Sequence, residues 1–260
     1  MKAYAKINLA LVVGPVRADG KHEVVTLLQR VGLADEVTVE EADALAVDGF
    51  DGDTLVRDAL ESLGGEAQVA PRWRARIEKR IPVAAGLGGG SSDAAAALRL
   101  ANDTLSEPLP PDRLHALAAA LGADVPFFLA DGPQVGTGDG STLEPVDLPQ
   151  EYAVVLVLPH GAVKESTGAV YARFDREEGF EARRERVLEA ARAGALHELP
   201  PNDLASSPLA AELVRLGAFR ADVSGAGPAV YGLFTDEGRA RAAAARLEPS
   251  ARVYLVAPAW

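Results

Sequence analysis

The chain has 260 residues, of which 48% are hydrophobic and 25% charged, a balance that suits one large domain or two closely associated ones and argues against wholesale disorder. Its net charge of −12 differs from the basic character of general nucleic-acid binders, so we expect no nucleic-acid partner. The absence of cysteine excludes disulfide bonds and thiolate metal sites.

The first residues, MKAYAKINLALVV, contain an apolar run that Lys6 and Asn8 interrupt. This pattern favours a strand over a secretion signal. The sequence has no run of 18 consecutive apolar residues, so it predicts no membrane span. We therefore expect a cytoplasmic protein with no membrane partner. It is expected to be a monomer or a homodimer.

Residues 1–81 predict strands with one helix among them. A strand over residues 2–13 is followed by Asp19-Gly20, which is a hairpin signal, and by a second strand through Val31. Alternating residues predict strands at 36–40 and 73–81. Between them, apolar residues at helical spacing predict a helix over 53–63.

The rest of the chain mixes helices and strands. Helices are expected at 91–100, at 112–121 with Asp112 as the N-cap and Gly122 just beyond its end, and at 183–192, 208–216 and 236–247. Strands are expected at 152–159, 229–234 and 252–258. This mixture predicts an α+β fold. The crossover near Leu148 predicts a boundary between a domain of residues 1–147 and one of residues 148–260.

The segment PVAAGLGGGSSDAAAAL, residues 82–98, carries the strongest functional signal. A glycine-rich loop between a strand and a helix exposes backbone N–H groups, and the helix adds the positive end of its dipole. Such a loop suits a phosphate group. The simpler alternative is a tight turn with a serine N-cap. The expected phosphate-binding residues are Pro82, Gly86, Gly88, Gly89, Gly90, Ser91 and Ser92.

The loop lacks the Gly-Lys-Ser/Thr of the Walker motif, and Ser91 stands where the dinucleotide motif has its last glycine. It resembles instead the phosphate loop of the galactokinase, homoserine kinase, mevalonate kinase and phosphomevalonate kinase (GHMP kinase) superfamily. AYAKINLALVV near the N-terminus and VSGAGPAVYGLF over residues 223–234 resemble two further motifs of that superfamily, in the same order.

This resemblance implies a two-domain fold. It consists of an N-terminal half like domain 2 of ribosomal protein S5 and a C-terminal ferredoxin-like half, with the active site in the cleft between them. ATP and Mg²⁺ are the implied cofactors. Three segments, RADGKH, LGADVPFFL and PNDL, narrow the resemblance to members that phosphorylate the 2-hydroxyl of 4-diphosphocytidyl-2-C-methyl-D-erythritol in non-mevalonate isoprenoid synthesis. This compound is the expected small-molecule partner.

The resemblance assigns catalysis to Lys6 and Asp124. Burying a charged lysine on an apolar strand costs free energy unless the ammonium meets an anion. The alternative is a lysine at the edge of the sheet whose ammonium reaches the solvent. Asp124 resembles the catalytic carboxylate that accepts a proton from the attacking hydroxyl, the alternative being a helix N-cap. Asn8 is expected to bind substrate or Asp124, or to be a structural amide. Ser92 and Asp124 are the candidate Mg²⁺ ligands.

Three residues are expected to bind the cytidine part of the substrate. His22 is implied to contact the cytosine edge and Tyr171 to stack on its ring; the alternatives are a surface histidine and a helix core tyrosine. Lys21 stands where the family usually has tyrosine, so one stacking partner is missing. This departure leaves two other functions open: a superfamily kinase with another alcohol substrate, and a nucleotide-binding regulator without catalysis.

Overall fold

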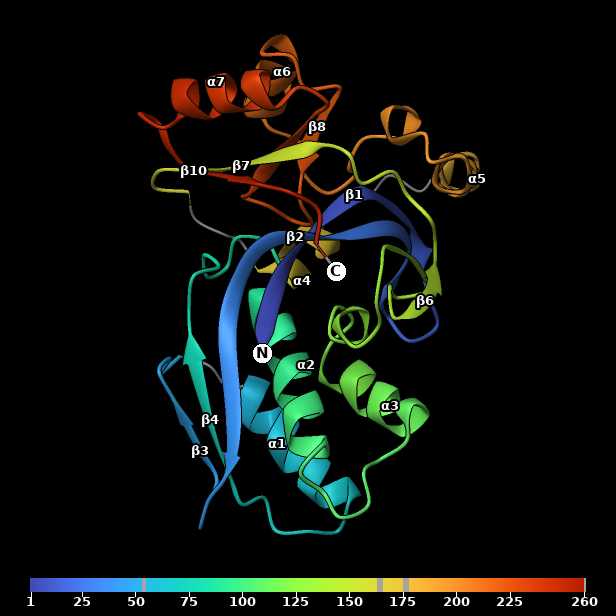
Figure 1. Ribbon diagram of the computed structural model, residues 1–260. Helices are drawn as coiled ribbons and strands as arrows, with labels where there is room; N and C mark the ends of the chain where they lie inside the picture. Colours follow the sequence, from blue (N-terminus) through green and yellow to red (C-terminus); the bar gives the residue numbers. More distant parts are fainter. Residues whose placement is uncertain (53–54, 163–165, 175–177, 260) are drawn as a thin grey trace. The chain divides into compact units, whose positions relative to one another are not determined.

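The computed structural model describes residues 1–52, 55–162, 166–174 and 178–259 (Figure 1). The predicted start of the first helix, Asp53 and Thr54, lies outside these residues. The chain forms two compact units, and each is described by itself. Unit 1 contains Met1–Ala5, Leu33–Val83 and Gly88–Asp131; unit 2 contains Lys6–Gly32, Ala84–Leu87 and Gly132–Trp260. Strands β1 (Lys2–Val16) and β2 (His22–Glu41) contribute residues to both units.

Unit 1 packs helices against a small sheet. The end of β2 pairs antiparallel with β4 (Trp73–Glu78), and β3 (Ala46–Asp48) pairs parallel with β4. Its helices are α1 (Leu55–Glu66), α2 (Gly89–Asn102) and α3 (Pro111–Leu121), followed by the 3-10 turn η1 (Pro126–Phe128). Figure 1 shows α1 and α2 side by side. Their contact is close because the buried face of α2 is largely alanine, which is also the best helix former.

Unit 2 contains a four-stranded antiparallel sheet in the order β10-β7-β9-β8. The strands are β7 (Ala153–Pro159), β8 (Arg220–Val223), β9 (Val230–Phe234) and β10 (Ala251–Val256). Between β7 and β8 lie α4 (Thr167–Ala172), α5 (Phe180–Ala193), the 3-10 turn η2 (Leu196–Glu198) and α6 (Pro208–Arg215). Helix α7 (Glu237–Leu247) connects β9 to β10. This β-α-β-β-α-β order is ferredoxin-like, as predicted.

The sheet of unit 2 is covered on both faces. Helices α6 and α7 pack on one face around Val155, Leu213 and Phe234 (Figure 1). On the other side, the hydroxyl of the buried Tyr231 donates to the carbonyl oxygen of Leu9 in β1 at 3.0 Å. The N-terminal part of β2 pairs with β5 (Gln134–Thr137), which pairs with β6 (Thr142–Pro145).

The structure corrects several local predictions. The two strands expected to end at Val31 and to begin at residue 36 are one strand, β2. Strands β3, β5, β6 and β8 and helix α4 were not predicted; the strands are only three or four residues long, too short for a clear periodic pattern. Asp112 is not an N-cap, because Pro110 takes that position without a side-chain bond and Asp112 lies in the first turn of α3. The division at residue 148 stays a prediction.

Candidate active site

The first half of the glycine loop belongs to unit 2, where it meets the third glycine motif. Gly86 has φ +83°, and a Cβ there would lie 2.4 Å from the carbonyl oxygen of Ser224 and 3.0 Å from that of Gly227. The Ser224 hydroxyl donates to the Gly86 carbonyl at 2.9 Å, and the amide of Ala229 donates to the carbonyl of Ala85 at 3.0 Å. Two motifs far apart in the sequence are therefore in direct contact.

The second half of the loop belongs to unit 1 and opens helix α2. The helix begins at Gly89, with Gly88 as its N-cap at φ +70°. Gly90 is exposed, and its Cβ position has open space around it. Ser91 is half-buried and Ser92 is 2% exposed, both inside the first turn, so neither is the N-cap and that alternative is wrong. Pro82, half-buried, precedes the loop.

Lys6 is buried in unit 2 among polar groups. It is 3% exposed, and its ammonium donates to Asn8 Oδ1 at 2.7 Å. Asn8 Nδ2 in turn donates to Thr26 Oγ1 at 2.8 Å. Gly225 approaches this pair, since its Cβ position lies 3.3 Å from Asn8 Oδ1 and 3.7 Å from Lys6 Nζ. Asn8 therefore orients Lys6, and the edge-lysine alternative is wrong.

Asn202 and Thr26 complete this network, and neither was predicted to do so. Asn202 Nδ2 donates to the carbonyl oxygens of Val223 at 2.9 Å and Gly225 at 2.7 Å, which holds the third glycine motif in place. The amide of Leu204 donates to Asn202 Oδ1 at 2.8 Å. The only signal in the sequence is the segment PNDL, since asparagine beside proline often organises a turn.

Asp124 lies in unit 1, on a turn between α3 and η1. The amide of Val125 donates to the carbonyl of Gly122 at 3.1 Å, and the rings of Phe127 and Phe128 pack edge to face at 5.1 Å. Asp124 itself is half-buried, whereas Val125 to Phe128 are buried. The buried residues anchor the turn on which the half-buried Asp124 lies. Asp124 and Lys6 belong to different units, so their pairing stays a prediction.

A charged cluster lies beneath the first turn of α2. Lys79 Nζ donates to Asp35 Oδ2 at 2.6 Å and to Asp93 Oδ2 at 2.7 Å. Burial raises the pKa of the Asp93 carboxyl to about 7, against the opposing effect of Lys79. Burial acts to lower the pKa of Lys79, but its hydrogen bonds to the two carboxylates raise that pKa overall, so Lys79 is charged at neutral pH.

The structure brings His22 and Tyr171 together in unit 2. Their ring centroids are 5.8 Å apart, and Phe174, which was not predicted, meets His22 edge-on at the same distance. His22 Nδ1 lies 2.8 Å from the carbonyl oxygen of Gly14. A carbonyl only accepts, so Nδ1 carries a hydrogen, and in the neutral tautomer with that hydrogen Nε2 is an acceptor.

Comparison with known proteins decides the family. The family descriptions GHMP kinases N terminal domain and GHMP kinases C terminal match residues 54–132 and 188–251. A 4-diphosphocytidyl-2-C-methyl-D-erythritol kinase from Kineococcus radiotolerans is 40% identical, over 95% of this chain and 85% of the relative. One from Pelodictyon phaeoclathratiforme is 34% identical, over 100% of this chain and 97% of the relative. The chain belongs to the 4-diphosphocytidyl-2-C-methyl-D-erythritol kinases, within the GHMP kinases.

A solved structure agrees with this family assignment. The crystal structure of 4-(cytidine 5'-diphospho)-2C-methyl-D-erythritol kinase matches with a TM-score of 0.84 and 33% identity, covering 100% of this chain and 99% of that chain. The predicted α+β, GHMP-kinase-like fold is thereby confirmed. In the described residues of this GHMP kinase, no helix has the length and apolar character needed to cross a bilayer.

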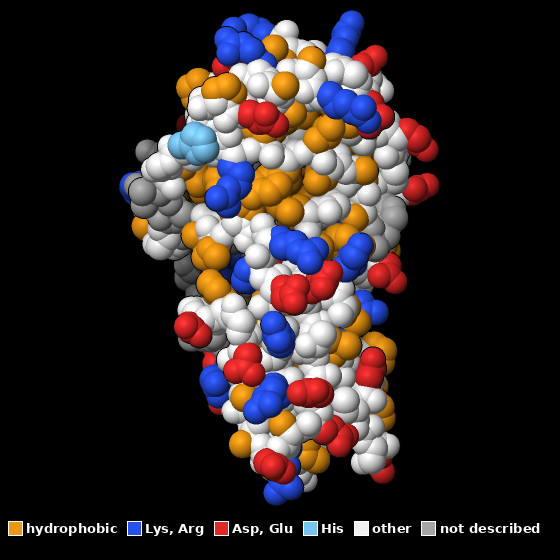
Figure 2. All heavy atoms as spheres, turned by 60° about the vertical axis from the view of Figure 1, so that its left-hand side comes forward, with side chains coloured by type: hydrophobic (Ala, Val, Ile, Leu, Met, Phe, Trp, Pro, Cys, Tyr) orange, Lys and Arg blue, Asp and Glu red, His pale blue; other side chains and the backbone are white. Residues whose placement is uncertain are grey.

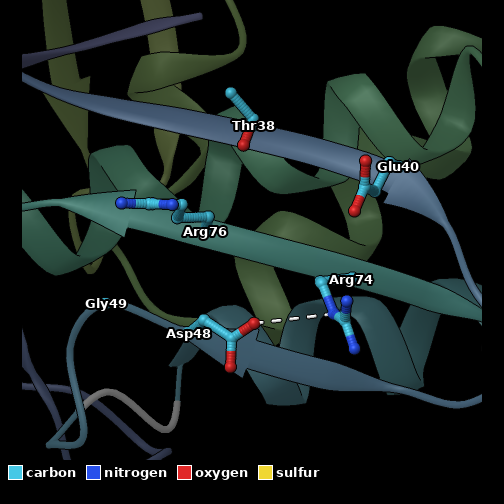
Figure 3. Close-up of a pocket in the computed structure, with 6 residues that line it drawn as sticks. All are labelled: Thr38, Glu40, Asp48, Gly49, Arg74 and Arg76. Carbon is cyan, nitrogen blue, oxygen red and sulfur yellow. Dashed lines mark ion pairs between the residues drawn. The ribbon is translucent and has the colours of Figure 1, made fainter.

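The kinase also has a pocket of about 460 Å³ whose lining includes none of the predicted site residues. It lies on the exposed face of β2, β3 and β4 in unit 1 (Figure 3) and is lined by Thr38, Glu40, Asp48, Gly49, Arg74 and Arg76. Arg74 Nε lies 3.5 Å from Asp48 Oδ2, and both side chains are more than half exposed. Acidic and basic side chains are interspersed over the face of unit 1 that Figure 2 shows. We interpret the pocket as a hydrated sheet surface with cross-strand charge pairs.

At the hairpin, Lys21 forms an ion pair. Its ammonium bonds Asp139 Oδ2 at 2.6 Å, and its side chain is 62% exposed. The hydrogen bond from Lys21, followed by one from Ser141, lowers the pKa of Asp139 to about 2. Lys21 thus ties the 17–22 hairpin to the turn at Asp139.

We expect a carboxyl NMR titration of Asp139 to give a midpoint of about 2. A depressed pKa means that the pair stabilises the fold above the ordinary value of 3.8 and that this contribution is lost as the pH falls from there to about 2. In Lys21→Gln the midpoint should move up toward 3.8. An unchanged midpoint in the variant would show that Lys21 does not hold Asp139 in solution.

Proposed function

We propose that this chain transfers the γ-phosphate of ATP to the 2-hydroxyl of 4-diphosphocytidyl-2-C-methyl-D-erythritol, the step of its family in non-mevalonate isoprenoid synthesis. The main support for this proposal is the similarity, over nearly the full length of the chain, to kinases named for this substrate. The buried Lys6 supports it further, because an ammonium held in a polar network is suited to a reaction that moves negative charge.

We assign the phosphates of ATP to the glycine loop. The amides that open α2 at Gly89 and Gly90 are the donors, because Gly90 is exposed with open space around it and the positive end of the helix dipole lies there. Gly86 and Gly88, both at positive φ, turn the backbone toward those amides. Ser91, half-buried in the first turn, is a further phosphate donor.

Mg²⁺ fits the oxygen donors of unit 1. Mg²⁺ keeps several waters and needs only one or two protein oxygens beside the phosphates of the nucleotide. Asp124 is half-buried and offers a carboxylate, with the Ser92 hydroxyl as the second candidate. In the described part of the chain, no three His, Asp or Glu side chains form a metal site by themselves, so ATP supplies the remaining ligands. When bound, the ion neutralises charge on the phosphates.

Lys6 and Asp124 act on the reacting groups in this proposal. Asp124 accepts the proton of the attacking hydroxyl, and Lys6 keeps that carboxylate ionised and stabilises negative charge on the transferred phosphoryl group. Asn8 holds the ammonium of Lys6 in position. Positioning and charge stabilisation dominate such a transfer.

The cytidine part is assigned to the hairpin of unit 2. His22 Nε2 accepts a hydrogen bond from the cytosine amino group, and Tyr171 stacks on the ring. Lys21 contributes a positive charge near the diphosphate. We assign residues 1–147 to an ATP-binding and catalytic domain, which also carries the hairpin with Lys21 and His22, and residues 148–260 to a substrate-side domain, which carries Tyr171. We place the enzyme in the cytoplasm, as a monomer or a homodimer.

A second candidate is a GHMP kinase for another alcohol, which the lysine at position 21 favours. A coupled ADP-release assay with ATP and Mg²⁺ separates the two. We expect turnover with the cytidine compound and none with methylerythritol lacking cytidine, homoserine or mevalonate. Turnover of one of those three alcohols, but not of the cytidine compound, would show that the chain is a kinase for another alcohol. ATP binding without turnover on any of the four would indicate a regulator.

A further inference from the structure

The charged cluster under α2 connects three segments of unit 1. Asp35 is fully buried on β2, and its Oδ1 accepts hydrogen bonds from the amides of Arg80 and Ile81, while its Oδ2 accepts one from Lys79. Asp35 thereby organises the residues that leave β4 and lead into the glycine loop.

The same lysine reaches the helix that opens after the loop. Lys79 Nζ donates to Asp93, whose side chain is 1% exposed, one turn into α2. The ammonium also lies directly beneath the first residue of the helix, because a Cβ on Gly89 would be 3.3 Å from Lys79 Nζ. One cation therefore joins β2, the end of β4 and the first turn of α2.

A buried ion cluster of this kind contributes little net free energy to the stability of the fold. Removing charged groups from water is costly, and well-packed apolar side chains often stabilise a fold at least as well. Charged hydrogen bonds instead impose geometry, since they act only at short distance and in defined directions. The segment whose geometry is imposed here is the one that presents the Gly89 and Gly90 amides.

We propose that Lys79, clamped between Asp35 and Asp93, is a positioning residue that sets the first turn of α2 for binding the phosphates of ATP. The inference rests on the proposed function in taking those amides as the phosphate site. It adds that the site depends on a cluster behind the helix, which acts through the backbone of the first turn.

The variant to test is Asp93→Ala. Replacing Lys79 would leave two buried carboxylates facing each other, which by itself can unfold the unit. Asp93→Ala removes only the link to α2, keeps the Lys79–Asp35 pair and inserts a good helix former. Asp93→Asn is the conservative variant, because its amide oxygen can still accept from Lys79.

The matched control is Thr104→Ala. Trp73 Nε1, at the start of β4, donates to Thr104 Oγ1, just beyond the end of α2, at 2.9 Å. This hydrogen bond also joins β4 to α2, but at the C-terminal end of the helix rather than at its first turn. Its loss weakens the β4–α2 contact without touching the first turn.

The measurements are the Kd of ATP with Mg²⁺ by calorimetry, without the alcohol, then KM and kcat with it, and the melting temperature. We expect Asp93→Ala to raise the ATP Kd about tenfold or more, with the KM of the alcohol within about twofold of wild type. Asp93→Asn should restore most of the ATP affinity. Thr104→Ala should lower the melting temperature and leave the ATP Kd unchanged.

Two results would overturn the inference. One is an ATP Kd in Asp93→Ala equal to that of wild type. The other is a result in which Asp93→Ala and Thr104→Ala change the ATP Kd by the same factor and the melting temperature by the same amount. The cluster would then only stabilise the fold. Wild-type protein that binds ATP but does not phosphorylate the cytidine compound would refute the proposed function alone, because the Kd comparison stands without turnover.

Discussion

Replacing Asp124 with Asn should lower kcat with the cytidine compound roughly 100-fold or more, which is the usual contribution of a general base. The amide keeps the shape of the side chain but cannot accept the proton of the attacking hydroxyl. The turn that carries Asp124 is anchored by Val125 to Phe128, which are buried, so the substitution should leave the fold intact. The measurement is steady-state ADP release at saturating ATP and alcohol.

Asp112→Asn is the matched control for this variant. Asp112 is an exposed residue in the first turn of α3, in the same unit, and is not one of the predicted site residues. It should retain wild-type kcat. If Asp124→Asn also turned over at the wild-type rate, positioning and charge stabilisation alone would account for catalysis, and the assignment of Asp124 as the base would be wrong.

Replacing Gly86 with Ala should cause the largest loss of stability among single-methyl additions to the glycine loop. Its backbone is in the left-handed region, which costs a non-glycine residue about 1–2 kcal/mol. The new Cβ would also lie 2.4 Å from the backbone oxygen of Ser224, which cannot rotate away. The loop and the third glycine motif must therefore separate, and we expect ATP-dependent turnover to be lost together with about 3 kcal/mol or more of unfolding free energy.

Gly90→Ala, in the same loop, adds the same methyl group without these costs. Gly90 is helical, and its Cβ position has open space around it. Alanine is the better helix former, so the unfolding free energy should stay equal or rise by about 1 kcal/mol. Urea denaturation of both variants tests the contrast. Equal stability of the two would mean that the Gly86–Ser224 contact does not form in solution.

The sequence predicted the parts of the site that depend on short motifs. Four glycines and two serines before an alanine-rich stretch predicted a loop that opens a helix, and α2 begins there at Gly89. Lys6 was predicted to avoid the edge of the strand and to meet an anion; the structure buries it and bonds it to the amide of Asn8, while its pairing with Asp124 stays a prediction. In both cases the residues that determine the outcome are neighbours in the chain.

The parts that were missed depend on partners distant in sequence. Asn202 supports the third glycine motif from 21 and 23 positions away, and Lys79 meets Asp35 at a separation of 44. No local pattern identifies such a partner, because an isolated Lys or Asp on an amphipathic strand has the same appearance whether it faces water or a buried carboxylate. The division of β2 into two expected strands failed for a related reason: polar residues in its middle resemble a turn.

The contact between Arg220 and Leu9 has a consequence for how the chain reaches its fold. The guanidinium of Arg220 donates to the carbonyl oxygen of Leu9, 211 positions earlier, and Tyr231 does the same from 222 positions away. Pairings of such high sequence separation require closing a very long loop before they stabilise anything, which slows folding. On a ribosome the apolar first strand has to wait for these partners while more than 200 further residues are made. Until then the buried carbonyl oxygen of Leu9 lacks these donors, so we expect this kinase to depend on chaperones during synthesis more than its size alone would suggest.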